Sequence, residues 1–177
     1  MKHTLVAIYE DSKHAGMAVG ELKNMGYTKD ISVVAKDVNA EGLETTDVKT
    51  DLGHEAAQGA GAGAVIGGTL GAIAGVLAGA ASLAVPVLGI AVVGPIVAGF
   101  TGAGVGGAAG SLVGALANMG IPDQKAKEYE QYISSGQVLV AVTTKPEDAS
   151  KVDEVLRRHV EMQDPAPSED RVYSYEW

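Results

Sequence analysis

Apolar positions along the chain change their spacing from one segment to the next, and each spacing predicts one kind of element. Residues 4–9 (TLVAIY) and 30–37 (DISVVAKD) are short runs rich in β-branched side chains, which indicates two strands. Between them a helical spacing begins at Asp11 or Ser12, which are good N-caps, and Gly26 is the expected stop. The apolar face of that helix consists of Ala15, Ala18, Val19, Leu22 and Met25.

The same order of elements returns in the second half of the chain. Pro122 and Asp123 suit the first turn of a helix, and Gly136 is expected to end it. Residues 137–143 (QVLVAVT) are an apolar, β-branched run and predict a third strand. The predicted apolar face of the helix consists of Ala126, Tyr129, Tyr132 and Ile133.

A further helix is expected to start at Pro146, with Ala149, Val152, Val155 and Leu156 as its apolar positions. We expect a short last strand at residues 160–163 and a loose tail at residues 165–177 (PAPSEDRVYSYEW). The tail ends in three aromatic side chains that are candidates for docking a protein partner or a neighbouring copy, with a disordered end as the alternative. These side chains are Tyr173, Tyr175 and Trp177.

Two β-α-β units of this length predict an α+β fold, a ferredoxin-like sandwich. An apolar helical hairpin rich in Gly and Ala is inserted between the second and third strands, at a loop where insertions are tolerated. The expected organisation is a first β-α-β half at 1–52, a glycine-zipper helical hairpin at 53–120, a helix and the second half at 121–164, and a flexible tail at 165–177.

The hairpin contains 67 consecutive residues, 56–122, without any Asp, Glu, Lys, Arg or His. Its glycines recur at every fourth position in two runs, so on a helix each run forms a ridge without side chains that lets another helix approach closely. We therefore predict a helix-packing interface. The predicted interface residues are Gly59, Gly63, Gly67, Gly71, Gly75, Gly79, Gly102, Gly106, Gly110 and Gly114.

Each glycine costs a helix in water roughly 1 kcal/mol relative to alanine, so something outside the helix must compensate. Residues 56–122 are long enough for two membrane spans of about 20 residues, with a turn expected at 83–95, where Pro86 and Gly89 interrupt the pattern. Insertion in a membrane and burial in a soluble oligomer are both open. The expected location is the cytoplasm or the cytoplasmic side of the membrane, since residues 1–12 do not read as a signal peptide.

The net charge of −9 restricts the partners. Residues 1–55 carry 6 basic and 10 acidic side chains, and residues 123–177 carry 7 and 12. Acidic flanks on both sides argue against nucleic acid, whose phosphates are bound by Lys and Arg. There is no cysteine, which excludes disulfides, thiolate nucleophiles and cysteine metal sites.

Candidate chemistry is sparse. Gly102, Gly104 and Gly107 match G-x-G-x-x-G, but the pattern lacks an uninterrupted preceding strand and is expected by chance in so glycine-rich a segment. His54 and Glu55 form a weak metal pair for which a solvated helix end is the simpler interpretation. The other histidines are His3, His14 and His159, and none has a second histidine one helical turn away. We therefore predict no catalytic residues, no metal and no cofactor.

The chain resembles the bacterial heat-induced general stress proteins. The resemblance depends on the Gly/Ala-rich middle with its proline-containing turn, the Gly120-Ile121-Pro122-Asp123 segment that opens a helix, the VLVAV strand at 138–142 and the LRRH segment at 156–159. Where the family pattern continues with a glycine after the histidine, this chain has a valine. The resemblance implies a stress-related protein that is often described as a membrane protein, and it brings no catalytic residues.

Two functions from different classes follow as expectations. In the first, the protein is not an enzyme but a structural or scaffold protein that self-associates through its glycine-rich hairpin in or on a membrane, with itself and membrane lipid as partners. In the second, the assembled apolar helices enclose a lipid-like or quinone ligand, and the protein is an oligomeric carrier for a partner enzyme.

Overall fold

A computed structural model describes residues 2–27, 29–36, 82–85, 90–96, 112–163 and 171–176, with the backbone alone for 82–85 and for Gln163. Six strands are present in these ranges: β1 (His3–Tyr9), β2 (Ile31–Lys36), β3 (Ser82–Val85), β4 (Ile90–Val93), β5 (Val138–Thr144) and β6 (Val172–Glu176). The helices are α1 (Ser12–Asn24), α4 (Leu112–Ala117), α5 (Asp123–Ser134), the 3-10 turn η4 (Pro146–Asp148) and α6 (Ala149–Gln163).

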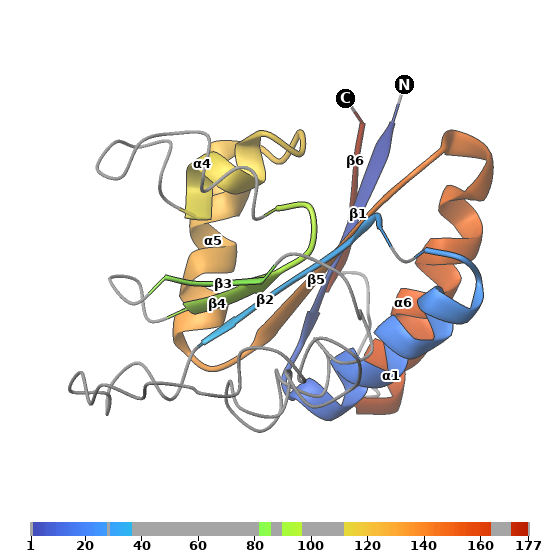
Figure 1. The fold of residues 1–177 in the computed structure, drawn as a ribbon, viewed down its shortest axis with the longest axis horizontal. Coiled ribbons are helices and arrows are strands. Elements are labelled where there is room, and N and C mark those ends of the chain that lie inside the picture. The colour runs from blue at the N-terminus through green and yellow to red at the C-terminus, as the bar shows by residue number, and fades with distance from the viewer. Residues whose placement is uncertain are drawn as a thin grey trace, which may run out of the picture.

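The strands form one sheet in the order β3-β4-β2-β5-β1-β6, and every neighbouring pair is antiparallel. Strand β5 lies between β1 and β2, with Val140 opposite Ala7 on one side and opposite Val33 on the other. The helices lie on both sides of this sheet, α1 and α6 on one face and α4 and α5 on the other (Figure 1). The predicted α+β class is therefore confirmed.

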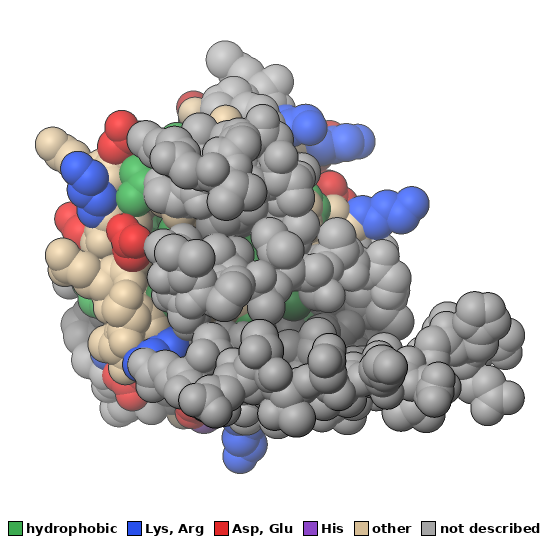
Figure 2. Space-filling view, turned by 60° about the vertical axis from the view of Figure 1, so that its left-hand side comes forward, with side chains coloured by type: hydrophobic (Ala, Val, Ile, Leu, Met, Phe, Trp, Pro, Cys, Tyr) green, Lys and Arg blue, Asp and Glu red, His purple; other side chains and the backbone are tan. Residues whose placement is uncertain are grey.

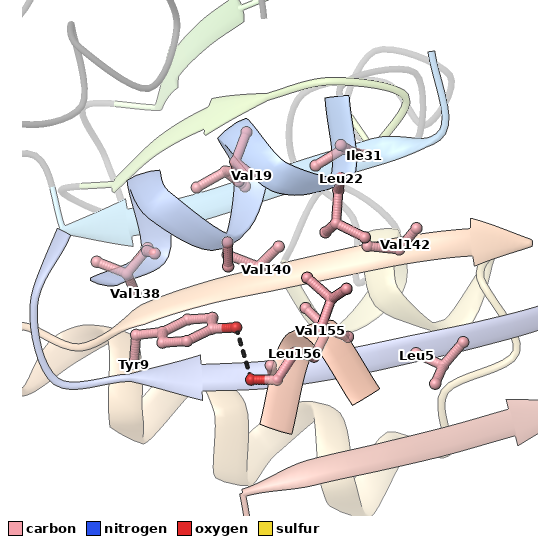
Figure 3. Packing of buried hydrophobic residues seen from close by; sticks show 14 of the residues in the cluster. Leu5, Tyr9, Val19, Leu22, Ile31, Val138, Val140, Val142, Val155 and Leu156 are labelled. Atoms are coloured by element: carbon pink, nitrogen blue, oxygen red, sulfur yellow. Dashed lines mark hydrogen bonds between the residues drawn. The ribbon is translucent and has the colours of Figure 1, made fainter. Parts of the chain in front are cut away.

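The face covered by α1 and α6 is one continuous apolar layer. Alternate residues of the strands point into it, as the two-residue period of a strand requires. Figure 3 shows Val19 and Leu22 of α1 and Val155 and Leu156 of α6 directed at this face. The hydroxyl of Tyr9, which is buried there, donates a hydrogen bond of 3.1 Å to the carbonyl oxygen of Leu156. This bond satisfies a phenol that would otherwise be costly to bury.

The opposite face is covered by α4 and α5. Val6, Val34 and Leu139 come from the sheet, and Leu116 and Tyr129 come from the two helices. The predicted apolar face of α5 is confirmed at its three buried positions, Ala126, Tyr129 and Ile133, whereas Tyr132 lies at the margin with 37% of its surface exposed. Each face of the sheet therefore has its own apolar layer.

Local signals placed most helix ends correctly. The carboxylate of Asp11 accepts a hydrogen bond of 2.8 Å from the backbone N–H of His14, which makes Asp11 the N-cap of α1. Gly26 and Gly136 follow the ends of α1 and α5 with φ angles of 99° and 100°, a left-handed conformation that favours glycine. The five elements predicted at 4–9, the first helix, 30–37, the second helix and 137–143 are all present within one or two residues.

The prediction of a turn between two helices at residues 83–95 was wrong. This part of the chain forms the antiparallel strands β3 and β4, and β4 pairs with β2 with Val34 opposite Val92. The physical reason is that Ile90-Ala-Val-Val, a run that fits a buried strand, finds β2 as its partner in the sheet. The middle of the uncharged segment is therefore part of the sheet of the folded domain.

The predictions for the C-terminal part were wrong in two places. Residues 160–163 are not a strand but the last turn of α6, because His159 and Val160 continue the buried helical spacing set by Val152, Val155 and Leu156. The last strand is instead β6, within the tail expected to be loose, and it pairs with β1. Alternation of Val172 and Ser174 with Tyr173 and Tyr175 is the period-two pattern that sequence reading passed over.

Candidate functional site

Nine of the ten predicted interface glycines lie outside the described residues: Gly59, Gly63, Gly67, Gly71, Gly75, Gly79, Gly102, Gly106 and Gly110. The tenth, Gly114, lies in the short helix α4. Leu112 and Leu116 of that helix are buried against the sheet and α5, while Gly114 is partly exposed. In this one turn the leucines face the core and Gly114 does not, and the predicted interface itself stays a prediction.

Directly after β4, the uncharged segment is fixed to the strand β2 by two close contacts. Gly94 follows β4 with φ of 100°, and its backbone passes so close to Ile31 that a Cβ there would overlap the carbonyl oxygen of that residue. Two residues further on, the N–H of Ile96 donates a hydrogen bond of 3.1 Å to the buried hydroxyl of Ser32. These contacts hold the chain against β2 where it leaves the sheet.

A second group of interacting side chains lies where α5 faces β6. The hydroxyl oxygens of Tyr129 and Tyr175 are 2.6 Å apart, a short hydrogen bond in which either group can donate. The ammonium of Lys125 lies 5.0 Å from the centre of the Tyr173 ring, which is within cation-π range, and is 2.8 Å from Glu128. The aromatic tail predicted to dock a partner thus contacts its own domain through these side chains.

Burial controls the ionisation of these tyrosines. Desolvation raises the pKa of Tyr129, and the hydrogen bond with Tyr175 raises it further. Desolvation also raises the pKa of Tyr175, although its bond to Tyr129 acts in the opposite direction. The hydrogen bond to Glu128 raises the pKa of Lys125. These shifts favour neutral tyrosines and a charged Lys125 in the contact between α5 and β6.

Among the described residues, an ionic group of four side chains connects α1 to α6. Glu21 receives Arg158 Nη1 on one carboxylate oxygen and His159 Nε2 on the other, each at 2.8 Å. Arg158 also contacts Glu154 at 3.0 Å. The ring of His159 is 91% buried, and its Nδ1 is enclosed and has no hydrogen-bond partner in the described part of the chain. These contacts join α1 to α6.

The other two described histidines each lie against a carboxylate. His14 contacts the capping carboxylate of Asp11 at 2.8 Å, and His3 lies 3.5 Å from Glu176 across the β1–β6 pair. Desolvation would raise the pKa of Asp11, but its hydrogen bonds from the backbone and ring of His14 outweigh it and lower that pKa. Within the described ranges there is no group of three His, Asp or Glu side chains that could hold a metal. His54, Glu55, Gly104 and Gly107 lie outside those ranges.

The described surface carries charges of both signs. Lys and Arg side chains are interspersed with Asp and Glu around the part of the molecule seen in Figure 2. Among the described helices, none combines the length and apolar character needed to cross a bilayer.

No protein-family model, curated protein or solved structure matches this chain. The site must therefore be interpreted from its own residues. Among the described residues, a folded α+β domain holds the uncharged, glycine-rich segment at β3, β4 and α4.

Proposed function

We propose that this protein is a non-enzymatic structural or scaffold protein that self-associates through the glycine stripes at 59–79 and 102–114. The supporting observation is the regular four-residue spacing of glycine in a 67-residue stretch without a charged side chain. A flexible linker has no need for such a register. A stripe without side chains, by contrast, allows two helices to approach closely enough for backbone contacts.

The anchoring of this stretch fits a scaffold. Strands β3 and β4 lie in the sheet, and α4 packs its leucines on the same core as α5. The two striped runs lie on either side of the β-hairpin in the sequence, so each run is attached to the domain at a fixed point. Copies that associate through the stripes would carry their α+β domains as a surrounding layer. We place this assembly in the cytoplasm or on the cytoplasmic face of a membrane.

We further propose that the domain is a ferredoxin-like sandwich with the uncharged segment inserted between β2 and β5. The strand order β2-β5-β1-β6 and the two units β1-α1-β2 and β5-α6-β6 support this assignment. Such a domain supplies a stable base for an insertion. The stress-related role rests on the resemblance of the sequence to the heat-induced general stress proteins.

The test places a leucine side chain at either of two neighbouring positions in the full-length protein. Gly71→Leu fills the predicted ridge, whereas Ala72→Leu places the same side chain about 100° away around the helix. Size-exclusion chromatography with light scattering, with and without detergent, should show a lower mass for G71L and an unchanged mass for A72L. A wild-type protein that is monomeric in both conditions, or equal effects of the two variants, would refute self-association through the stripe.

Two further measurements separate the rival interpretations. Carbonate and salt washes of cell membranes distinguish an inserted protein from a peripheral or soluble one. Organic extraction of protein purified from its natural source, followed by mass spectrometry, tests the carrier function. A lipid-like or quinone molecule recovered in amounts close to the protein would favour the carrier over the scaffold.

A further inference from the structure

Strand β6 ends the described sheet, and its hydrogen-bonding pattern leaves one row of peptide groups directed outward. The N–H of Ile8 donates to the carbonyl oxygen of Arg171 at 3.1 Å, so that residue bonds toward β1. In an antiparallel ladder, inward and outward bonding alternates along the strand. The peptide groups of Tyr173 and Tyr175 therefore face β1, and those of Val172, Ser174 and Glu176 face away from it.

The described residues of β6 lack three of the features that discourage another strand from pairing with an edge. Natural edge strands carry Lys, Pro or a bulge that discourages another strand, and the sequence of β6 (VYSYE) has none of these. Ser174 and Glu176 are exposed. On this edge Arg157 Nη2 reaches the outward carbonyl oxygen of Val172 at a long 3.4 Å. A carbonyl oxygen has a second lone pair and can still accept from another strand.

We propose that this edge pairs with the same edge of a second copy of the chain. A two-fold axis perpendicular to the sheet leaves each side chain on the same face in both copies. Two residues that lie opposite each other across the axis must therefore project from the same face of the sheet. The three residues whose peptide groups face away from β1 meet this requirement when the axis passes beside Ser174. Val172 is then opposite the second copy's Glu176, and Ser174 is opposite its own equivalent.

Charge complementarity selects this register. Val172 belongs to the apolar layer under α6, so Glu176, two alternations further along, projects on the same face. Arg157 of α6 lies beside Val172, and its Nε already donates to Asp153 of the same helix at 2.8 Å. A guanidinium has five N–H donors and can bind a second carboxylate. The register therefore places the second copy's Glu176 next to Arg157, and the symmetry creates this pair twice. Within one copy Glu176 instead lies beside His3 at the other end of the strand, so the Arg157 pair arises only between copies.

The other face of the edge is complementary as well. Tyr173 and Tyr175 point toward α5, where Lys125 and Tyr129 hold them in place. In the same register Tyr173 lies directly opposite the second copy's Tyr175. Cross-strand aromatic pairs of this kind stabilise antiparallel sheets. One alignment thus satisfies the backbone, the charged face and the aromatic face together.

A single introduced cysteine tests the contact in the full-length chain, which has no cysteine of its own. In the proposed register the two Ser174 Cα atoms are about 5.5 Å apart, as for any hydrogen-bonded antiparallel pair. Disulfides bridge Cα atoms about 4.4–6.8 Å apart. On mild oxidation Ser174→Cys should therefore form a covalent dimer. Ser150→Cys, exposed on α6, is the control and should stay mostly monomeric at the same concentration.

Cross-linking of S174C no greater than that of S150C would overturn the proposal. A charge exchange in the S174C background tests the register. Glu176→Arg should lower the yield of cross-linked dimer several-fold. Combining it with Arg157→Gln, which removes the repulsion without placing a second carboxylate beside Asp153, should restore much of the yield. A double variant that cross-links no better than E176R alone would also overturn the register. The contact is independent of the glycine stripes, so Gly71→Leu should leave the S174C cross-link unchanged.

Discussion

The hydroxyl pair of Tyr129 and Tyr175 is the interaction that most directly connects the C-terminal strand to a helix, and its energy can be measured by a double-mutant cycle. Tyr129 is fully buried, whereas Tyr175 is partly exposed. Tyr175→Phe leaves the buried phenol of Tyr129 without its partner, which should cost about 2 kcal/mol of unfolding free energy. Tyr129→Phe leaves a hydroxyl that water can reach and should cost about 1 kcal/mol.

The double variant should cost much less than the sum. Replacing both partners removes one hydrogen bond but leaves no orphaned group, so the expected loss is about 1 kcal/mol rather than about 3 kcal/mol. The coupling between Tyr129 and Tyr175 is then about 2 kcal/mol. Urea unfolding of the four proteins, followed by circular dichroism, gives the four free energies. Tyr132→Phe, at an exposed position on the same helix, is the control and should change stability by less than about 0.5 kcal/mol.

Losses that add within about 0.5 kcal/mol would refute this reasoning, because additivity means that the two hydroxyls act independently. The 2.6 Å contact would then contribute nothing to the attachment of β6.

Three further predictions follow from single contacts. Gly94→Ala should cost about 3 kcal/mol, because a Cβ there adds overlap with the Ile31 carbonyl to a φ of 100°, whereas Gly136→Ala, with the same φ and open space, should cost about 1–2 kcal/mol in urea unfolding. Burial raises the pKa of Tyr9 above its unfolded value, so its contribution is complete below about pH 10 and falls at higher pH by about 1.4 kcal/mol per pH unit. Above about pH 10, the unfolding free energy of Tyr9→Phe should therefore fall less steeply with pH than that of the wild type. Equal dependence on pH in the two proteins would contradict the burial of a neutral Tyr9. Asp11→Ala should cost about 1 kcal/mol at pH 7 through loss of the N-cap. Because hydrogen bonds lower the pKa of Asp11, that difference should vanish as the pH falls to about 2, and a difference that persists in acid would contradict it.

Elements whose signals are local were predictable from the sequence. The first helix shows its N-cap in Asp11 and its stop at Gly26, and the structure has both. Its predicted apolar face is confirmed at four positions but wrong at Met25, which follows the last helical residue and is 41% exposed. The strands β1, β2 and β5 are runs of β-branched residues buried on both faces, which is why they read as continuous apolar stretches.

The errors arose where distant partners decide the structure. Residues 90–93 are equally apolar whether they end a helix or pair with a strand, and only the presence of β2 beside them makes them a strand. The last five described residues resemble a polar tail in composition. They form a strand because β1, at the other end of the sequence, presents a free edge to them. No local pattern reveals such a partner.

The candidate interface is predictable only as a pattern. Glycine spacing identified ten positions, of which the described residues include Gly114 alone. The tyrosine pair and the outward edge of β6 were invisible to sequence reading, because each depends on where β6 pairs.

The position of β1 has a consequence for the newly made chain. Its described neighbours in the sheet are β5 and β6, both encoded after the long uncharged stretch. A ribosome therefore releases the first strand and the whole glycine-rich passage before either neighbour exists. Until the C-terminal third is translated, the nascent chain exposes its uncharged, glycine-rich segment without a completed domain beside it. Molecular chaperones or a nearby lipid surface have their greatest opportunity to act during that interval.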